Sequence, residues 1–280
     1  IYQDKMVMGK IEAAHRLKKP IDGHAPGVKG DDLIKYANAG ISTDHECTSE
    51  AEAIEKIGLG MKTLIREGSA AKNFESLVGL LNTHPDMVMF CSDDKHPHEL
   101  INGHINELVV RALAKGMDLY DVLKACTIQP VEHYNLEVGT LRIGDPADFI
   151  VVDNLTDFKV KSTYINGEKV AENGHDFIST IPFKILNRFD RIPIQLKDLE
   201  IKGESGEYRV IEVIDGELWT KEGHYQLNAK NGVVQSDIEK DVLKIIVLSR
   251  YDQSPPAIGW IKNFNFKKGA IASSVAHDSH

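Results

Sequence analysis

Short apolar stretches alternate with amphipathic, helix-like stretches through the first half of the chain. Apolar residues recur at helical spacing in residues 5–19, 31–39, 49–61, 72–81 and 105–115. Extended candidates lie between them at residues 21–23, 41–43, 63–65 and 87–91. Ser49 and Glu52 have the spacing of a capping box, which marks the start of a helix. Alternating strands and helices predict a sheet of parallel strands joined by right-handed crossovers.

The pattern changes near Gly139 and again near residue 181. Residues 139–180 contain short strand-like runs and tight turns, and Asn166-Gly167 predicts a type I′ hairpin. Further on, Asp215-Gly216 predicts a hairpin between residues 208–214 and 217–220. Residues 237–243 have a helical pattern and residues 244–248 form a strand candidate. We therefore expect an α/β region at 1–138, a β-rich segment at 139–180 and an α+β domain at 181–280.

Polar clusters lie where three of the extended stretches end, at residues 22–27, 42–46 and 92–94. His45 follows His24 by 21 residues and Asp93 follows His45 by 48, which are steps of one and two strand–helix units. Such units average about 30 residues in a (β/α)8 barrel, and four successive units are half a barrel. Because parallel strands end at one face, we expect the three side chains to converge. Two imidazoles and a carboxylate suit a divalent metal that activates water, so the pattern predicts a metal site.

Each candidate also has a plainer interpretation, since a single histidine at a strand end is more often a hydrogen-bonded structural residue. Glu46 is our candidate for proton transfer or substrate binding, or else an ordinary charge at a helix N-terminus. Asp93 could also accept a proton, and Asp94 competes with it as the ligand. Arg66, Asp94 and His104 are candidates for a substrate pocket.

Composition narrows the range of partners. The 280 residues carry a formal net charge of −9, which argues against nucleic acid or an anionic membrane surface as a partner and leaves small substrates open. Three cysteines cannot form a disulfide framework, and their odd number fits a reducing cytoplasm. The apolar runs of the sequence are shorter than a membrane span.

The same clusters carry a family resemblance. Residues 23–27 (Gly-His-Ala-Pro-Gly), 40–48 (Gly-Ile-Ser-Thr-Asp-His-Glu-Cys-Thr) and 90–94 (Phe-Cys-Ser-Asp-Asp) resemble the adenine deaminases of the amidohydrolase superfamily. The likeness continues through residues 103–106 and 144–148 to the tail at 274–280. It covers essentially the whole chain. The His-Glu-Cys-Thr stretch and the His-Asp-Ser-His tail distinguish this group from amidohydrolases in general.

The resemblance implies a metal-dependent hydrolase that converts adenine and water to hypoxanthine and ammonia. His24, His45 and Asp93 would be the ligands after the fifth, sixth and eighth barrel strands, within a two-metal centre holding manganese or iron, with zinc as a possibility. Glu46 and Asp93 would move protons. The resemblance also makes residues 1–138 the C-terminal half of the barrel, 139–180 a small β-sandwich segment and 181–280 the C-terminal domain of that family.

The chain departs from this pattern upstream of His24. In the family an H-x-H pair after the first strand and a carboxylate after the fourth complete the centre, whereas residues 1–20 contain only His15. We therefore expect a fragment that lacks the N-terminal half of the barrel and the extreme C-terminus. Alone it should be inactive and should require the missing half as a partner. We also expect a homo-oligomer.

Three alternatives remain open. The chain could belong to an amidohydrolase that acts on another purine, on a cyclic amide or on an acylated amino acid. It could also be a non-catalytic binding module derived from a barrel, with its metal residues as remnants. In the tail, His277 and His280 could contribute ligands or substrate contacts, or the small-residue run before them could simply pack against another element.

Overall fold

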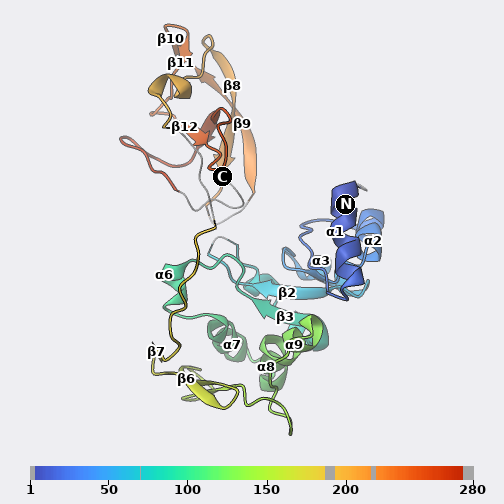
Figure 1. The fold of residues 1–280 in the computed structure, drawn as a ribbon. Helices are drawn as coiled ribbons and strands as arrows, with labels where there is room; N and C mark the ends of the chain where they lie inside the picture. Colours follow the sequence, from blue (N-terminus) through green and yellow to red (C-terminus); the bar gives the residue numbers. More distant parts are fainter. Residues whose placement is uncertain (1–3, 70, 187–192, 216–218, 274–280) are drawn as a thin grey trace. The chain divides into compact units, whose positions relative to one another are not determined.

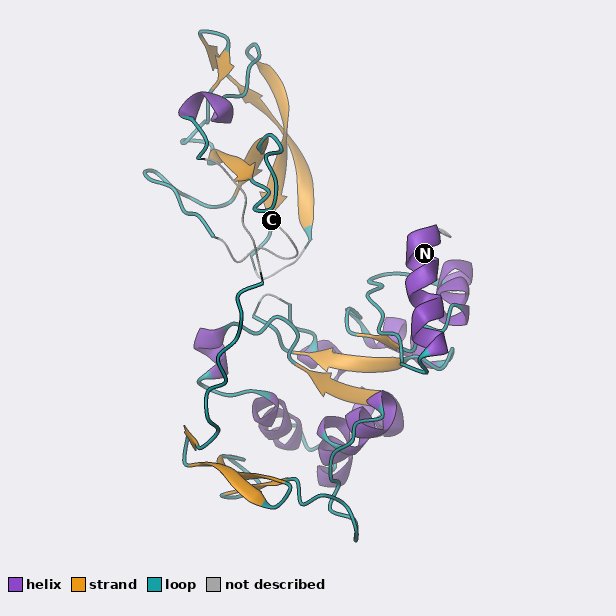
Figure 2. Cartoon of the chain, in the orientation of Figure 1, coloured by secondary structure: helices purple, strands orange, loops and turns teal. Residues whose placement is uncertain are grey.

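The computed structural model describes residues 4–69, 71–186, 193–215 and 219–273, shown as a ribbon in Figure 1 and by secondary structure in Figure 2. The chain divides into two compact units, residues 1–180 and 181–280. Each unit is described by itself below.

A parallel sheet organises the first unit. Its strands are β1 (Thr43–Asp44), β2 (Lys62–Arg66) and β3 (Val88–Cys91), and they lie side by side in chain order. A parallel bridge between Ile21 and Ile41 extends the same order to the segment that precedes His24. Four successive segments therefore end at one edge of the sheet, as the alternating pattern predicts.

Helices precede, separate and follow these strands along the chain. They are α1 (Lys5–Arg16), α2 (Gly30–Asn38), α3 (Glu50–Ile57), α4 (Phe74–Leu77), α5 (Leu80–Thr83), α6 (Pro97–Leu100), α7 (Ile105–Ala114), α8 (Leu119–Cys126) and α9 (Ile128–Tyr134), with a 3₁₀ turn η1 at Pro85–Met87. The single helix predicted at 72–81 is divided into α4 and α5. The division arises because the amides of Leu81 and Asn82 bond to carbonyls three residues back, which tightens the turn between the two helices.

The core of the first unit lies between the sheet and the helices that follow it. The strands contribute Ile65 and Phe90, while α4 and α5 contribute residues such as Leu77. The apolar faces of α7 and α8 complete the cluster with Leu108 and Val122. Burial of each large apolar side chain contributes roughly 1.5–3 kcal/mol. The strand ends that carry the polar clusters are thus supported by a packed core.

A second, antiparallel sheet closes the first unit. Its strands β4 (Phe149–Val152), β5 (Val160–Ile165), β6 (Glu168–Glu172) and β7 (His175–Asp176) pair in chain order. Asn166 and Gly167 have φ values of 50° and 80°, and Ile165 pairs with Glu168 across them. These positive angles are those of a type I′ turn, so the predicted hairpin is confirmed.

The second unit is built on a four-stranded sheet. Strand β8 (Gly206–Val213) pairs antiparallel with β9 (Thr220–Leu227), which confirms the antiparallel pairing predicted around Asp215. The second strand begins at Thr220 rather than at residue 217, and Gly216 of the predicted turn lies outside the described residues. Strand β12 (Val242–Val247) pairs antiparallel with β13 (Ala257–Lys262), and β13 pairs parallel with β8. The resulting order is β12-β13-β8-β9, so β13 lies in the interior of the sheet although it follows the other described strands in sequence. The short strands β10 (Ala229–Lys230) and β11 (Val233–Val234) pair separately, and a 3₁₀ turn η2 lies at Leu196–Leu199.

The helix predicted at residues 237–243 is wrong. Asp237 and Val242 instead exchange backbone hydrogen bonds of 2.9 and 2.8 Å across a tight turn, and β12 begins at Val242. The turn is held because Asp241, at φ 57°, accepts the amides of Asn263 and Asn265 on its carboxylate. The described part of the second unit therefore contains strands and the 3₁₀ turn but not the α-helix that an α+β domain requires.

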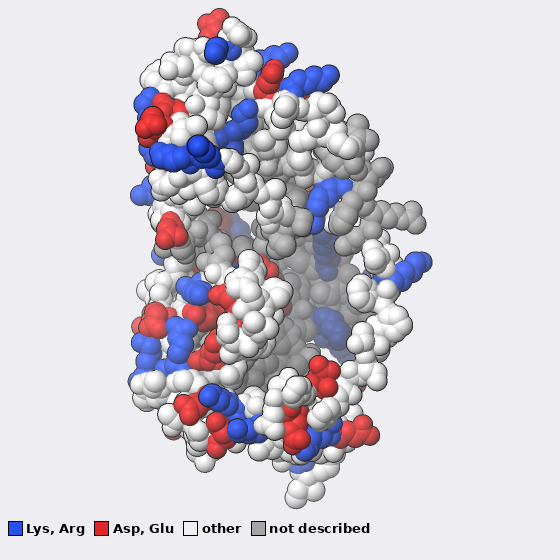
Figure 3. All heavy atoms as spheres, turned by 90° about the vertical axis from the view of Figure 1, so that its left-hand side faces the viewer, with Lys and Arg blue, Asp and Glu red and all other residues white. Residues whose placement is uncertain are grey.

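Basic and acidic side chains are interspersed on the face drawn in Figure 3. Both signs of charge are thus present on this face, although the chain as a whole carries a formal net charge of −9. None of the described helices combines the length and the apolar composition needed to cross a lipid bilayer.

Candidate metal site

The predicted site residues follow the strands of the parallel sheet. His24 lies three residues beyond the bridge at Ile21, and His45 and Glu46 come directly after β1. Arg66 is the last residue of β2, and Asp93 lies two residues beyond β3. All five therefore lie at the carboxyl end of the sheet.

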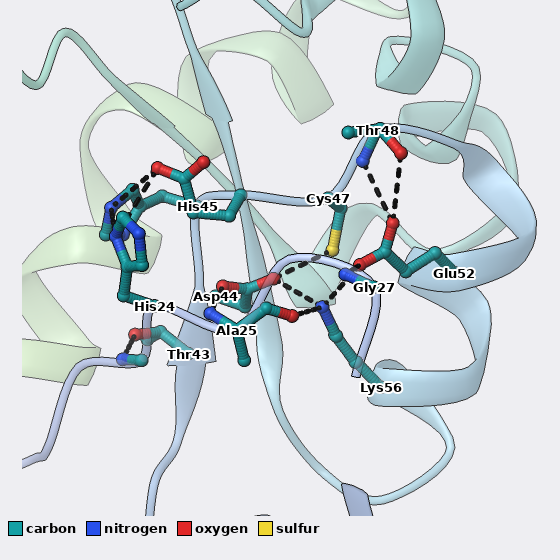
Figure 4. A network of polar contacts seen from close by, with 12 residues as sticks. His24, Ala25, Gly27, Thr43, Asp44, His45, Cys47, Thr48, Glu52 and Lys56 are labelled. Atoms are coloured by element: carbon teal, nitrogen blue, oxygen red, sulfur yellow. Dashed lines mark hydrogen bonds and ion pairs between the residues drawn. The ribbon is translucent and has the colours of Figure 1, made fainter. Parts of the chain in front are cut away.

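His24, His45 and Glu46 form a compact cluster of donor atoms. The Nδ1 atom of His24 lies 3.3 Å from Nε2 of His45, and Glu46 Oε1 is 3.5 and 3.4 Å from these two nitrogens. Figure 4 shows the two imidazoles side by side, with ring centroids 5.2 Å apart. The Glu46 side chain is only 9% exposed, whereas that of His24 is 65% exposed. Two imidazole nitrogens and a carboxylate oxygen this close together match the donors that zinc, iron and manganese take, so the cluster fits a divalent cation.

Asp93 reaches this cluster through Arg66. One guanidinium nitrogen, Nη1, lies 2.5 Å from Asp93 Oδ2 and also contacts Glu46 Oε1. The Arg66 side chain is buried, and its Nε has no hydrogen-bond partner among the described residues. Asp93 has a φ of 46°, a left-handed conformation that aspartate tolerates better than most residues. The structure thus places Glu46, rather than Asp93, beside the two imidazoles, and the predicted ligand role of Asp93 stays a prediction.

The other predicted pocket residues lie near Asp93. His104 Nε2 is 2.9 Å from the Ser92 hydroxyl, and burial together with the charge of Lys95 lowers the pKa of this imidazole. The carbonyl of Asp94 accepts the amide of Ser69 at 3.2 Å. His277 and His280 lie outside the described residues.

A buried ion network lies beside the imidazoles, to their right in Figure 4. Lys56 of α3 is fully buried, and its ammonium contacts Asp44 Oδ2 at 2.6 Å and Glu52 Oε1 at 2.7 Å. Asp44, Cys47 and Glu52 could hold a metal by their chemistry alone. The Lys56 ammonium already supplies the cation between the two carboxylates of this group, so we assign this second cluster a structural role.

Burial and hydrogen bonding act in opposite directions in this network. Burial favours the neutral form of Lys56, but its hydrogen bonds to Asp44 and Glu52 outweigh burial and raise the lysine pKa. Burial also opposes ionisation of Glu52, yet hydrogen bonds from Lys56, Thr48 and Gly27 lower its pKa. For Cys47, burial and the nearby Asp44 raise the pKa of the thiol, which donates to Asp44 at 3.2 Å. The network therefore holds an ammonium ion, an ionised Glu52 and a protonated thiol.

Sequence reasoning identified Glu52 only as part of a capping box and missed Lys56. The Ser49 hydroxyl does accept the Glu52 amide at 3.4 Å, as the box requires. The Glu52 carboxylate, however, is directed at Thr48, Gly27 and Lys56. The sequence did contain a signal for a buried ion pair. Lys56 comes four residues after Glu52 and lies on the same helix face as Ala53, which is fully buried.

Comparisons with known proteins show which family the chain resembles in sequence. Residues 1–170 match the model of the amidohydrolase family, and residues 217–280 match that of the adenine deaminase C-terminal domain. An adenine deaminase of Salinibacter ruber is 50% identical over 98% of this chain and 50% of its own length. The adenine deaminase of Methanosarcina mazei is 50% identical over 98% of this chain and 52% of its own length. That of Borreliella burgdorferi is 45% identical over 100% of this chain and 52% of its own length. Among solved structures, a β-aspartyl dipeptidase of Fervidobacterium islandicum AW-1 is similar with a TM-score of 0.47 and 20% identity, covering 64% of this chain and 53% of that chain.

The chain belongs to the amidohydrolase family, whose model covers more than half of it. It spans about half the length of the curated relatives that it matches.

Proposed function

We propose that the protein carrying this chain is a metal-dependent hydrolase that deaminates adenine to hypoxanthine and ammonia. The observation that carries the proposal is the convergence of His24, His45 and Glu46 at the carboxyl end of a parallel sheet. Adenine as the substrate is supported by relatives of that name at 45–50% identity over nearly the whole chain.

His24 and His45 would hold the cation, with Glu46 as the nearest third donor and Asp93 as the second carboxylate at the same face. A bound divalent ion, manganese or iron with zinc as the alternative, supplies the Lewis acidity that makes water a nucleophile at neutral pH. Arg66 places a positive charge between Glu46 and Asp93, which fixes the two carboxylates relative to each other. We infer a two-metal centre whose remaining ligands come from outside this chain.

The reaction needs two proton transfers, and the site offers two carboxylates. The oxygen of water becomes the C6 oxygen of hypoxanthine, the C6–N bond to the exocyclic amine breaks, and ammonia leaves. Of the two protons of water, one ends on the ring nitrogen and one on the departing amine. Glu46 and Asp93, joined through Arg66, are the groups of this chain positioned to carry them.

We further propose that residues 1–138 form the C-terminal half of a (β/α)8 barrel and residues 139–180 a small β-sandwich segment. The half-barrel is supported by the three parallel strands β1, β2 and β3, which lie in chain order and are extended by the bridge at Ile21. The β-sandwich segment is supported by the four antiparallel strands β4 to β7. The only histidine upstream of His24 is His15, so the family's H-x-H pair must come from another segment. The three free thiols support a reducing, cytoplasmic setting.

Ammonia release from adenine, with manganese or iron added, tests the function in the native polypeptide that carries this sequence. We expect turnover that a chelator abolishes and that His45→Ala lowers by more than the roughly 10–100-fold typical of outer-shell changes. Other purines and cyclic amides serve as competing substrates. A metal-loaded native protein that ignores adenine but hydrolyses one of these would overturn the substrate assignment.

The half-barrel assignment has a separate test. The 280-residue chain alone should release no ammonia from adenine under the same conditions, since the remaining ligands are missing. Robust turnover by the isolated chain would contradict this assignment and leave the substrate assignment intact.

A further inference from the structure

We propose that Lys56 is a positioning residue for the metal site, fastening the two histidine-bearing loops to one helix. The inference rests on the proposed function, because it concerns the same cation site. Lys56 itself does not touch the imidazoles. It acts through the residue that follows His24 and the residue that precedes His45.

The Lys56 ammonium has three protons and three acceptors. It donates to the carbonyl of Ala25 at 2.7 Å, to Asp44 Oδ2 at 2.6 Å and to Glu52 Oε1 at 2.7 Å. Ala25 directly follows His24, and Asp44 directly precedes His45. One fully buried side chain therefore holds the residue next to each imidazole.

The two carboxylates extend this hold to further backbone groups. Asp44 Oδ1 accepts the amide of Ala25 at 3.0 Å, so the Ala25 residue is bound at both its N–H and its C=O. Glu52 Oε1 accepts the amide of Gly27 at 2.8 Å. Glu52 Oε2 accepts the amide and the hydroxyl of Thr48 at 3.1 and 3.2 Å. Figure 4 shows the Thr48 contacts ending on the Glu52 carboxylate, which in turn contacts Lys56.

Stability alone is a poor reason for such a network. Removing three charges from water costs several kcal/mol per ion, and well-packed apolar side chains often serve as well or better. An apolar replacement would not, however, connect a loop carbonyl, a strand-end carboxylate and a helix. The network gives geometric definition to His24 and His45, whose nitrogens must converge on one cation.

Cobalt(II) binding to the native polypeptide tests this role, using Lys56→Met and the control Lys35→Met. Lys35 lies on α2, pairs only with Asp32 at 3.0 Å among the described residues, and has an exposed side chain. We expect Lys56→Met to weaken cobalt affinity about 10–100-fold, the range seen when an outer-shell partner of a ligand is lost. We also expect it to shift the visible absorption of the fully loaded protein. Lys35→Met should change neither.

The absorption of the loaded protein separates positioning from stability, since a variant that is only less stable keeps the wild-type spectrum when saturated with metal. A folded Lys56→Met protein with wild-type affinity and spectrum would overturn the inference. Should Lys56→Met not fold, Asp44→Asn takes its place, because the single oxygen of asparagine cannot accept both the Ala25 amide and the Lys56 ammonium. An unchanged Asp44→Asn spectrum would then overturn the inference. A wild-type protein that binds no cobalt would instead refute the proposed metal-dependent function.

Discussion

Replacing Gly23 by alanine tests whether the close approach of two strand ends sets the position of His24. A β-carbon at residue 23 would lie 2.2 Å from the carbonyl oxygen of Thr43 and 2.9 Å from Cγ2 of Ile41. The Thr43 oxygen cannot retreat easily, since Thr43 is fully buried and pairs with Lys62 in the sheet. The segment that carries His24 must therefore move outward.

The cost of Gly23→Ala has two parts. Forcing an extra methyl group into a packed site costs about 1–3 kcal/mol. Outward movement also breaks the 3.2 Å hydrogen bond from the Gly23 amide to the Thr43 hydroxyl, which contributes about 1 kcal/mol. We expect a loss of about 2–4 kcal/mol in the free energy of unfolding, or roughly 5–15 °C for a unit of this size. We also expect weaker metal binding because His24 is displaced.

The two units can be followed by different signals. Both tryptophans, Trp219 and Trp260, lie in the second unit, whereas all the described α-helices lie in the first. Gly23→Ala should lower the midpoint of helical ellipticity and leave the tryptophan fluorescence transition unchanged. Gly9→Ala is the matched control. Gly9 lies within α1, and a β-carbon at this position would meet no neighbouring side chain or loop within 4 Å, so alanine there should stabilise the helix by about 0.5–1 kcal/mol. Wild-type unfolding and metal affinity in Gly23→Ala would refute the reasoning.

Three further substitutions test the fold. Leu77→Ala should open a cavity and destabilise the first unit by about 2–5 kcal/mol, as measured by helical ellipticity. Leu227→Ala should destabilise the second unit by a similar amount, as measured by tryptophan fluorescence. If Leu77→Ala shifted the fluorescence transition and Leu227→Ala the ellipticity transition, the assignment of the two cores would be contradicted. Asp148 accepts the amides of Asn166 and Gly139, both at 2.7 Å, and these bonds lower its pKa. Ionised Asp148 therefore stabilises the fold fully at pH values above about 4, the pKa of an aspartate in the unfolded chain. This stabilisation is lost as the pH falls through the lower pKa that Asp148 has in the folded protein. Wild type and Asp148→Asn should differ in urea midpoint at neutral pH and converge in acid, and a difference independent of pH would count against this.

The strand–helix order was predictable because it is a local property. Apolar periodicity over a few residues identified β2 and β3, and the parallel order then brought His24 and His45 together without any further information. The hairpin at Asn166-Gly167 was equally local, since positive φ values at both positions favour these two residue types.

What escaped prediction depends on contacts distant in sequence. Glu52 and Lys56 have the spacing of an exposed helical ion pair, and only the packing of α3 against two loops makes it a buried one. The carboxylate beside the imidazoles is Glu46 rather than Asp93 because Arg66, from another strand, lies between them. The false helix at 237–243 failed for the same reason, since Asp241 takes its partners from residues 263 and 265.

The interior place of β13 has a consequence for biosynthesis. As the polypeptide leaves the ribosome, β8 and β9 can pair early, but the other edge of β8 stays bare until residues 257–262 emerge. A nascent chain that stalls or terminates between β9 and β13 therefore presents an unpaired strand edge, the kind of surface that invites aggregation. The four-stranded sheet β12-β13-β8-β9 can form only after β13 has been translated.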